Sequence, residues 1–231
     1  MATLKRFQSQ SARPLPVIVL ADTSGSMSAD GKIEALNKSL KEMISTFASE
    51  SRIRAELQVC VITFGGTADI HLPLTPAHHI ESFDQLPATG GTPMGAAFKL
   101  VADLIDDKEQ IPSRAYKPVV VLVSDGYPTD NIELPLKELM NGDRSSKATR
   151  FAIGVGSDED WSVLETFAND LEAPVFKTEQ ARDIHRFFKA VTMSVTTRSR
   201  STAPNQATPL VLPPASSSTE TEDNEYEELD F

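Results

Sequence analysis

Short apolar runs alternate along the chain with longer segments in which apolar residues recur every three or four positions. Short runs rich in β-branched residues are typical of buried strands, and a spacing of three to four is typical of amphipathic helices. The sequence therefore predicts strands and helices in alternation. The expected strands are 17–21, 55–64, 68–72, 119–123, 150–156 and 174–177, and the expected helices are 33–47, 93–105, 132–140, 161–167 and 184–195.

This alternation favours a layered α/β fold with a mostly parallel sheet. Gly65 and Gly66 separate two strands and predict a hairpin turn, so we expect 68–72 to be an antiparallel edge strand. The continuous apolar run 119–123 is typical of a central strand. In open sheets of this kind, ligands bind beyond the carboxyl ends of the strands, where the strand order reverses. That edge is the expected location of a functional site.

The pattern divides the chain into three parts. Residues 1–14 are polar and basic and predict a flexible lead-in, and 15–197 hold the expected elements of one folded domain. Residues 198–231 are first rich in Pro, Ser and Thr and then acidic. This composition predicts a disordered acidic C-terminal tail.

Charge and cysteine content narrow the function. The formal net charge of −11 argues against nucleic-acid binding by phosphate neutralisation. Cys60 is the only cysteine, so an intramolecular disulfide and a cysteine metal cluster are excluded, and an inert strand residue is expected. The first apolar run is too short for a signal peptide or a membrane span. We therefore expect a cytoplasmic protein that binds neither nucleic acid nor membrane.

Polar oxygen-bearing residues follow two of the expected strands. Asp22, Ser24 and Ser26 come directly after the first strand, and Asp125 follows the run 119–123. Thr92, before Pro93, is expected to be the N-cap of the next helix. These side chains offer only oxygen, which suits a hard divalent cation such as Mg²⁺.

The five positions form a D-x-S-x-S…T…D pattern that resembles the metal-ion-dependent adhesion site of von Willebrand factor A domains. The resemblance covers about residues 15–195 and implies a three-layer α/β/α, Rossmann-like fold. It also implies that Asp22, Ser24, Ser26, Thr92 and Asp125 form the metal site. In such a site the hydroxyls coordinate the cation directly, and the carboxylates act through water or from the second coordination shell. Mg²⁺ is the expected cation, with Mn²⁺ and Ca²⁺ as alternatives. A carboxylate (Asp or Glu) or phosphate oxygen of a protein partner would fill an open coordination position.

Within that family, the compact size and the sequences Gly-Gly-Thr-Pro-Met and Ser-Asp-Gly-Tyr-Pro-Thr-Asp resemble the TerY-like tellurite-resistance branch. The resemblance implies a cytosolic adaptor in a stress or tellurite-resistance system, with a protein kinase and a PP2C-type phosphatase as partners. An alternative is an accessory subunit of an AAA-type ATPase, as other intracellular A domains are.

An enzymatic alternative is a Mg²⁺-dependent phosphotransferase of the haloacid-dehalogenase type, which also places an Asp at the end of the first strand. That chemistry needs a second acid two residues later, and this chain has Ser24 there. Neither a G-x-S-x-G elbow nor a Walker loop is present in the sequence. We therefore expect a binding protein and not an enzyme.

Two residues after Asp125 are candidates for the rim of the site. Tyr127 could line the rim and contact a partner. Asp130 is favoured as a turn residue or helix cap over a rim contact.

The acidic segment has two interpretations, a solubilising tail and a docking or phosphorylation segment. Thr219, Thr221 and Tyr226 stand among acids and are the candidate phosphorylation sites. Phosphate there would add about −1.5 to −2 charge. An acidic side chain of the tail could also occupy the metal site of its own or a neighbouring molecule.

Overall fold

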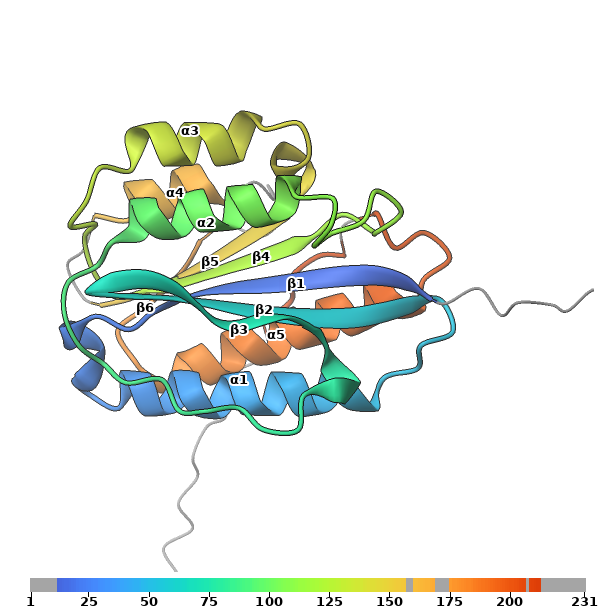
Figure 1. Cartoon of the computed structure of the whole chain (residues 1–231). Helices are drawn as coiled ribbons and strands as arrows, with labels where there is room; N and C mark the ends of the chain where they lie inside the picture. The colour runs from blue at the N-terminus through green and yellow to red at the C-terminus, as the bar shows by residue number, and fades with distance from the viewer. Residues whose placement is uncertain (1–11, 157–159, 169–174, 207, 213–231) are drawn as a thin grey trace, which may run out of the picture.

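A computed structural model describes residues 12–156, 160–168, 175–206 and 208–212. A six-stranded sheet lies between two helical layers, with α1 and α5 on one face and α2, α3 and α4 on the other (Figure 1). The expected three-layer α/β fold is confirmed. The strands are β1 (Arg13–Asp22), β2 (Ala55–Gly65), β3 (Thr67–Pro76), β4 (Val119–Ser124), β5 (Thr149–Val155) and β6 (Phe176–Thr178). The helices are α1 (Lys32–Ser49), α2 (Met94–Asp106), α3 (Glu133–Asn141), α4 (Ser162–Phe167) and α5 (Arg182–Arg200), with 3-10 turns η1 (Gly25–Ser28), η2 (Ala77–His79) and η3 (Ser145–Lys147).

The strand order is β3-β2-β1-β4-β5-β6. All pairs are parallel except β2 and β3, which are antiparallel. Gly66 has a φ of +75°, which a residue with a side chain rarely adopts, and it turns the chain from β2 into β3. The predicted hairpin and antiparallel edge strand are therefore confirmed. Because the chain builds outward from β1 on one side and then from β4 on the other, the strand order reverses between β1 and β4.

Alternation along β1 divides the core in two. Val17 and Val19 pack into the cluster that α1 and α5 complete, whereas Ile18 and Leu20 pack into the cluster that α2 completes. All four side chains are fully buried. Because successive side chains of a strand point to opposite faces, a continuous apolar run is what two helical layers require. The core therefore fixes β1, and with it the position of Asp22.

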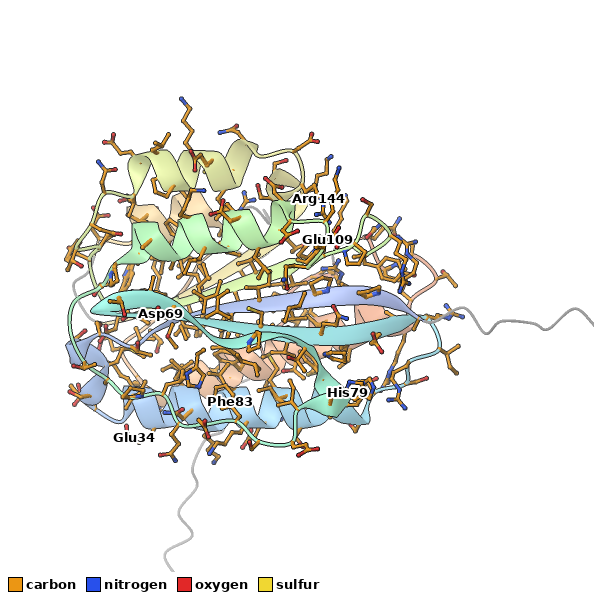
Figure 2. The ribbon with its side chains drawn as sticks, viewed as in Figure 1. Glu34, Asp69, His79, Phe83, Glu109 and Arg144 are labelled. Atoms are coloured by element: carbon orange, nitrogen blue, oxygen red, sulfur yellow. The ribbon has the colours of Figure 1, made fainter. Side chains whose placement is uncertain are left out.

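The helices bury the faces that the sequence predicts. On α1, Leu36, Leu40 and Met43 are buried against the sheet. Glu34 points away from the sheet on the outer surface of the same helix (Figure 2). Among the described residues, no helix is long and apolar enough to cross a membrane.

The folded part begins earlier than the sequence predicts. Arg13 and Pro14 already pair with β2, although residues 1–14 were expected to be a lead-in. Pro14 and Pro16 fit in this central strand because the pairing of β1 with β4 starts only at Val17. On that side a missing backbone N–H therefore breaks no ladder hydrogen bond.

The folded part also extends beyond residue 197, where the sequence placed the start of the tail. Helix α5 continues to Arg200, and Asn205 and Thr208 after it hydrogen-bond to Lys117 and Ser194 of the folded part. The buried Arg198 guanidinium donates to the carbonyls of Pro204 (2.9 Å) and Lys117 (3.1 Å), and the Ser194 hydroxyl donates to the Thr208 carbonyl (2.9 Å). The sequence pattern did not predict that this stretch belongs to the folded part. The stretch is held by hydrogen bonds from a buried arginine, and it has no apolar stripe that periodicity could detect.

Candidate metal centre

Asp22 lies at the end of β1, fully buried, with both carboxylate oxygens in hydrogen bonds. Its Oδ1 accepts from the backbone N–H of Ser24 (2.8 Å), and its Oδ2 accepts from the Ser124 hydroxyl (2.6 Å). The first bond holds the loop that follows β1 in a tight turn, and the second joins β1 to β4. Asp22 therefore fixes both the loop after β1 and the neighbouring end of β4 from a buried position beneath the loop.

Asp125 lies directly after β4 and is held in the same way. Its Oδ1 accepts from the Ser26 hydroxyl (2.7 Å), and its Oδ2 accepts from the Lys32 ammonium (2.8 Å). The Ser24 and Ser26 hydroxyl oxygens are 3.0 Å apart. The structure thus brings Asp22, Ser24, Ser26 and Asp125 into one hydrogen-bonded network across the point where the strand order reverses.

Thr92 reaches the site on a loop that packs directly against the one after β1. The backbone N–H of Gly25 donates to the Gly90 carbonyl (2.9 Å), and the Thr92 N–H donates to the Thr129 hydroxyl (3.0 Å). Gly90 has a φ of +74°, and a Cβ there would lie 2.5 Å from the Cα of Gly66. Only glycine at position 90 allows the Thr92 loop to approach the β2–β3 turn at Gly66 so closely.

The expected N-cap role of Thr92 is wrong. Helix α2 begins at Met94 with Pro93 as the preceding residue, and no side-chain cap comes from that position. Asp130 caps the helix, since its Oδ1 and Oδ2 accept from the backbone N–H groups of Gly95 (2.9 Å) and Ala96 (2.8 Å). A residue that follows β4 therefore satisfies the helix terminus, and among the described residues the Thr92 hydroxyl has no hydrogen-bond partner.

Both candidate rim residues are exposed, and each contacts the protein itself. The cap interpretation of Asp130 is the one that the structure supports, because both of its oxygens bind α2. Tyr127 is 54% exposed, and its hydroxyl accepts a hydrogen bond from the backbone N–H of Asp160 (2.9 Å). A contact between Tyr127 and a partner stays a prediction. Thr219, Thr221 and Tyr226 lie outside the described residues.

Burial dominates the acid–base behaviour of Asp22. The pKa of its carboxyl is raised from 3.8 to about 6, chiefly by desolvation and to a smaller extent by the charge of Asp125. The hydrogen bonds from Ser124 and Ser24 oppose this rise and offset only part of it. A nearby positive charge would favour the ionised carboxylate and reverse the shift.

The donor set fits a hard divalent cation. The carboxylates already accept hydrogen bonds, and the neutral oxygens of the candidate donor set are the hydroxyls of Ser24, Ser26 and Thr92. Mg²⁺ prefers oxygen ligands and retains several waters, so three hydroxyls with two carboxylates behind them satisfy its needs. Among the described residues, no group of three or more His, Cys, Asp or Glu side chains could hold a metal ion. A site here depends on hydroxyl oxygens.

Sequence reasoning missed three residues that hydrogen-bond to the candidate ligands, namely Lys32, Ser124 and Thr129. Ser124 had a signal, because it is the last residue of a buried strand and a hydroxyl there needs a partner. Lys32 and Thr129 had none, since their partners are 93 and 37 residues away in the chain.

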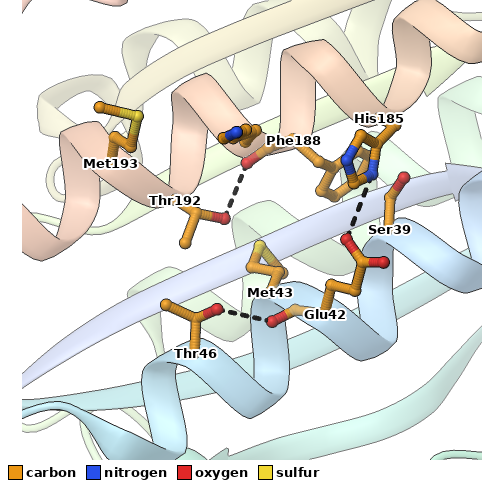
Figure 3. A pocket seen from close by; sticks show the side chains of 9 residues that line it. Ser39, Glu42, Met43, Thr46, His185, Phe188, Thr192 and Met193 are labelled. Atoms are coloured by element: carbon orange, nitrogen blue, oxygen red, sulfur yellow. Dashed lines mark hydrogen bonds and ion pairs between the residues drawn. The ribbon is translucent and has the colours of Figure 1, made fainter.

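A separate groove of about 320 Å³ lies between α1 and α5 (Figure 3). None of the predicted metal ligands lines it. His185 faces Glu42 across the groove, with 3.2 Å between His Nδ1 and Glu Oε2 (Figure 3). Met43 and Phe188 supply its apolar floor.

Comparison with known proteins gives one family. The family model of the von Willebrand factor type A domain matches residues 17–190. A search of curated proteins finds no relative.

Solved structures match the fold at low sequence identity. Proximal thread matrix protein 1 from the mussel byssus superposes with a TM-score of 0.62 at 20% identity, covering 79% of this chain and 48% of that one. A second structure of that protein has a zinc-occupied MIDAS motif. A von Willebrand factor type A protein from Catenulispora acidiphila gives a TM-score of 0.61 at 20% identity (79% and 42% covered), and the ArnB paralog VWA2 from Sulfolobus acidocaldarius gives 0.56 at 14% (81% and 46%). The chain spans about half the length, or less, of the solved structures that it matches.

Proposed function

Because the chain belongs to the von Willebrand factor type A domain family, we propose that it is a cytosolic adaptor that binds an anionic protein partner through a divalent cation. Members of this family are generally metal-dependent protein-interaction modules. One observation carries the proposal: the hydrogen-bonded network of Asp22, Ser24, Ser26 and Asp125, assembled from the ends of β1 and β4. Its position, where strand order reverses, is where open α/β sheets bind ligands.

The proposed ligands are the hydroxyls of Ser24, Ser26 and Thr92. The bound cation supplies positive charge and an open position for a carboxylate or phosphate oxygen. Asp22 holds the Ser24 backbone, and Asp125 orients the Ser26 hydroxyl. These contacts support a preorganised site, because the ligands need not be ordered when the ion binds.

Mg²⁺ is the proposed cation, with Mn²⁺ and Ca²⁺ as alternatives, and zinc must be tested because it occupies the corresponding motif of the mussel protein. The proposed activity is binding and not catalysis. Ser24 stands where a phosphotransferase of the haloacid-dehalogenase type needs its second acid. We also propose that the protein acts as TerY-like proteins do, with a kinase and a PP2C-type phosphatase as the partners to test first.

Calorimetry with each metal and a pull-down with and without chelator test this function. Asp22→Asn removes a charge behind the site, and Asp84→Asn, on an exposed connection, is the matched control. We expect Asp22→Asn to bind Mg²⁺ at least about tenfold more weakly and to lose chelator-sensitive partners. The proposal would be contradicted if the wild-type protein binds none of the metals and if chelator does not change which partners are recovered in the pull-down.

A further inference from the structure

The Lys32 side chain places a permanent positive charge at the candidate metal centre. Its ammonium lies 2.8 Å from Asp125 Oδ2, and the two side chains are 13% and 0% exposed. Both charged groups have given up most of their hydration, so removing one partner leaves the other as a buried charge without compensation. Lys32 is therefore part of the electrostatics of the site.

The local structure gives no other reason for a lysine at this position. Lys32 is the first residue of α1, where the helix dipole disfavours a positive charge. The chain reaches it through Asp30 (φ +55°) and Gly31 (φ +72°), two successive left-handed residues that turn the helix start toward Asp125. A non-glycine residue in that conformation costs free energy. The contact that favours a cation at position 32 is the ion pair with Asp125.

Charge counting shows the consequence for metal binding. The network joins two carboxylates, Asp22 and Asp125, with one ammonium, so its formal charge is −1 without metal. A divalent cation brings the total to +1. Without the lysine, the same site with its divalent cation bound would be neutral. The ammonium therefore opposes the incoming metal and leaves a positive site that an anion neutralises.

We propose that Lys32 couples metal binding to anion binding, so that the cation is held weakly alone and firmly only with an anionic partner oxygen. This inference rests on the proposed function and deepens it. The partner chemistry that it selects is an anionic oxygen, a carboxylate or a phosphate, and neutral carbonyl or hydroxyl ligands are rejected. By linkage, metal strengthens anion binding by the same factor.

The test measures Mg²⁺ affinity by calorimetry on the full chain, in buffer free of carboxylate and phosphate, then with acetate and separately with inorganic phosphate. Lys32→Gln removes the charge but keeps an N–H donor toward Asp125. Lys32→Arg keeps the charge, and Lys38→Gln, on the exposed face of α1, is the matched control.

Without anion, Lys32→Gln should bind Mg²⁺ at least about tenfold more tightly than wild type, because one opposing charge is gone. Acetate and phosphate should then strengthen Mg²⁺ binding in wild type and much less in Lys32→Gln. Lys32→Arg and Lys38→Gln should behave as wild type. A response to phosphate alone would restrict the partner group to phosphate, and a response to acetate alone to carboxylate.

Stability gives a second readout that needs no anion. In chelator, Lys32→Gln leaves Asp125 without a cation and should unfold at a lower temperature than wild type, and Mg²⁺ should restore most of the loss. Unchanged Mg²⁺ affinity in Lys32→Gln, or a loss of stability that Mg²⁺ does not restore, would overturn the coupling alone. A wild type that binds no metal with or without the anions would overturn the proposed function as well.

Discussion

The Ser124 hydroxyl donates a 2.6 Å hydrogen bond to the Asp22 carboxylate, across the two central strands and 102 residues of sequence. Both residues are fully buried. This bond ties the end of β1, where the candidate metal loop begins, to the end of β4, which carries Asp125. The two halves of the site therefore keep a fixed separation before any metal arrives.

Ser124→Ala should destabilise the metal-free protein by about 1–3 kcal/mol, because a buried carboxylate oxygen loses its donor. Urea unfolding in chelator measures the loss. Ser39→Ala is the control, since the Ser39 hydroxyl donates only to a carbonyl of its own helix. Equal losses in the two variants would show that the bond to Asp22 contributes nothing specific.

The raised pKa of Asp22 predicts how stability varies with pH in the absence of metal. The pKa of Asp22 is about 6 in the folded state and 3.8, the ordinary aspartate value, in the unfolded state. The folded state therefore holds the proton more tightly than the unfolded state. The resulting stability is complete below about pH 4 and is lost as pH rises through about 6, on the order of 3 kcal/mol in all. Asp22→Asn should abolish this part of the pH dependence.

The same pKa predicts that metal and proton compete. A cation needs the ionised carboxylate behind it, so Mg²⁺ affinity should fall about tenfold for each pH unit below about 6. Calorimetry between pH 5 and 7.5 measures this. An affinity that is constant over that range would contradict a role for Asp22 in holding the ion.

Asp130→Ala should lower stability by about 1–2 kcal/mol, since two N–H groups at the start of α2 lose their acceptor. Thermal unfolding measures the change. Asp103→Ala, an exposed residue of the same helix, should cost less than about 0.5 kcal/mol. If both variants unfold at the same temperature, Asp130 does not cap the helix in solution.

Truncation tests where the folded part ends. A chain that stops at residue 212 should match the stability of the full chain, whereas one that stops at 197 loses Arg198 and every contact of that buried side chain. Arg198 is 1% exposed, and this burial lowers the pKa of its guanidinium to about 10. If the chains that end at 212 and at 197 have equal denaturation midpoints, the residues after 197 do not stabilise the domain, and its boundary is at residue 197.

Cys60 should be unreactive in the folded protein. Burial raises the pKa of its thiol to about 12, so very little thiolate exists at neutral pH. A colorimetric thiol assay should report no reaction in native buffer and one thiol per chain in guanidinium. Reaction of the native protein at the rate of a free thiol would show that β2 opens readily.

The sequence determined the order of the elements, the hairpin edge and the strand ends that carry Asp22 and Asp125. Each of these follows from local chemistry: period-two and period-3.6 burial, and glycines at tight turns. The five candidate ligands could be predicted because each belongs to a short motif beside a strand or helix. Their role in metal binding stays a prediction.

Only the tertiary structure decided which groups meet at the site. Lys32 with Asp125, Ser124 with Asp22, and Asp130 with the start of α2 are contacts across 35 to 102 residues. Sheet order and the packing of loops create these contacts, and neither is encoded in local periodicity. The same holds for the segment after α5, where one buried arginine secures a stretch whose composition predicts disorder. Local patterns specify the elements, but the charge balance of the site is a property of the packed fold.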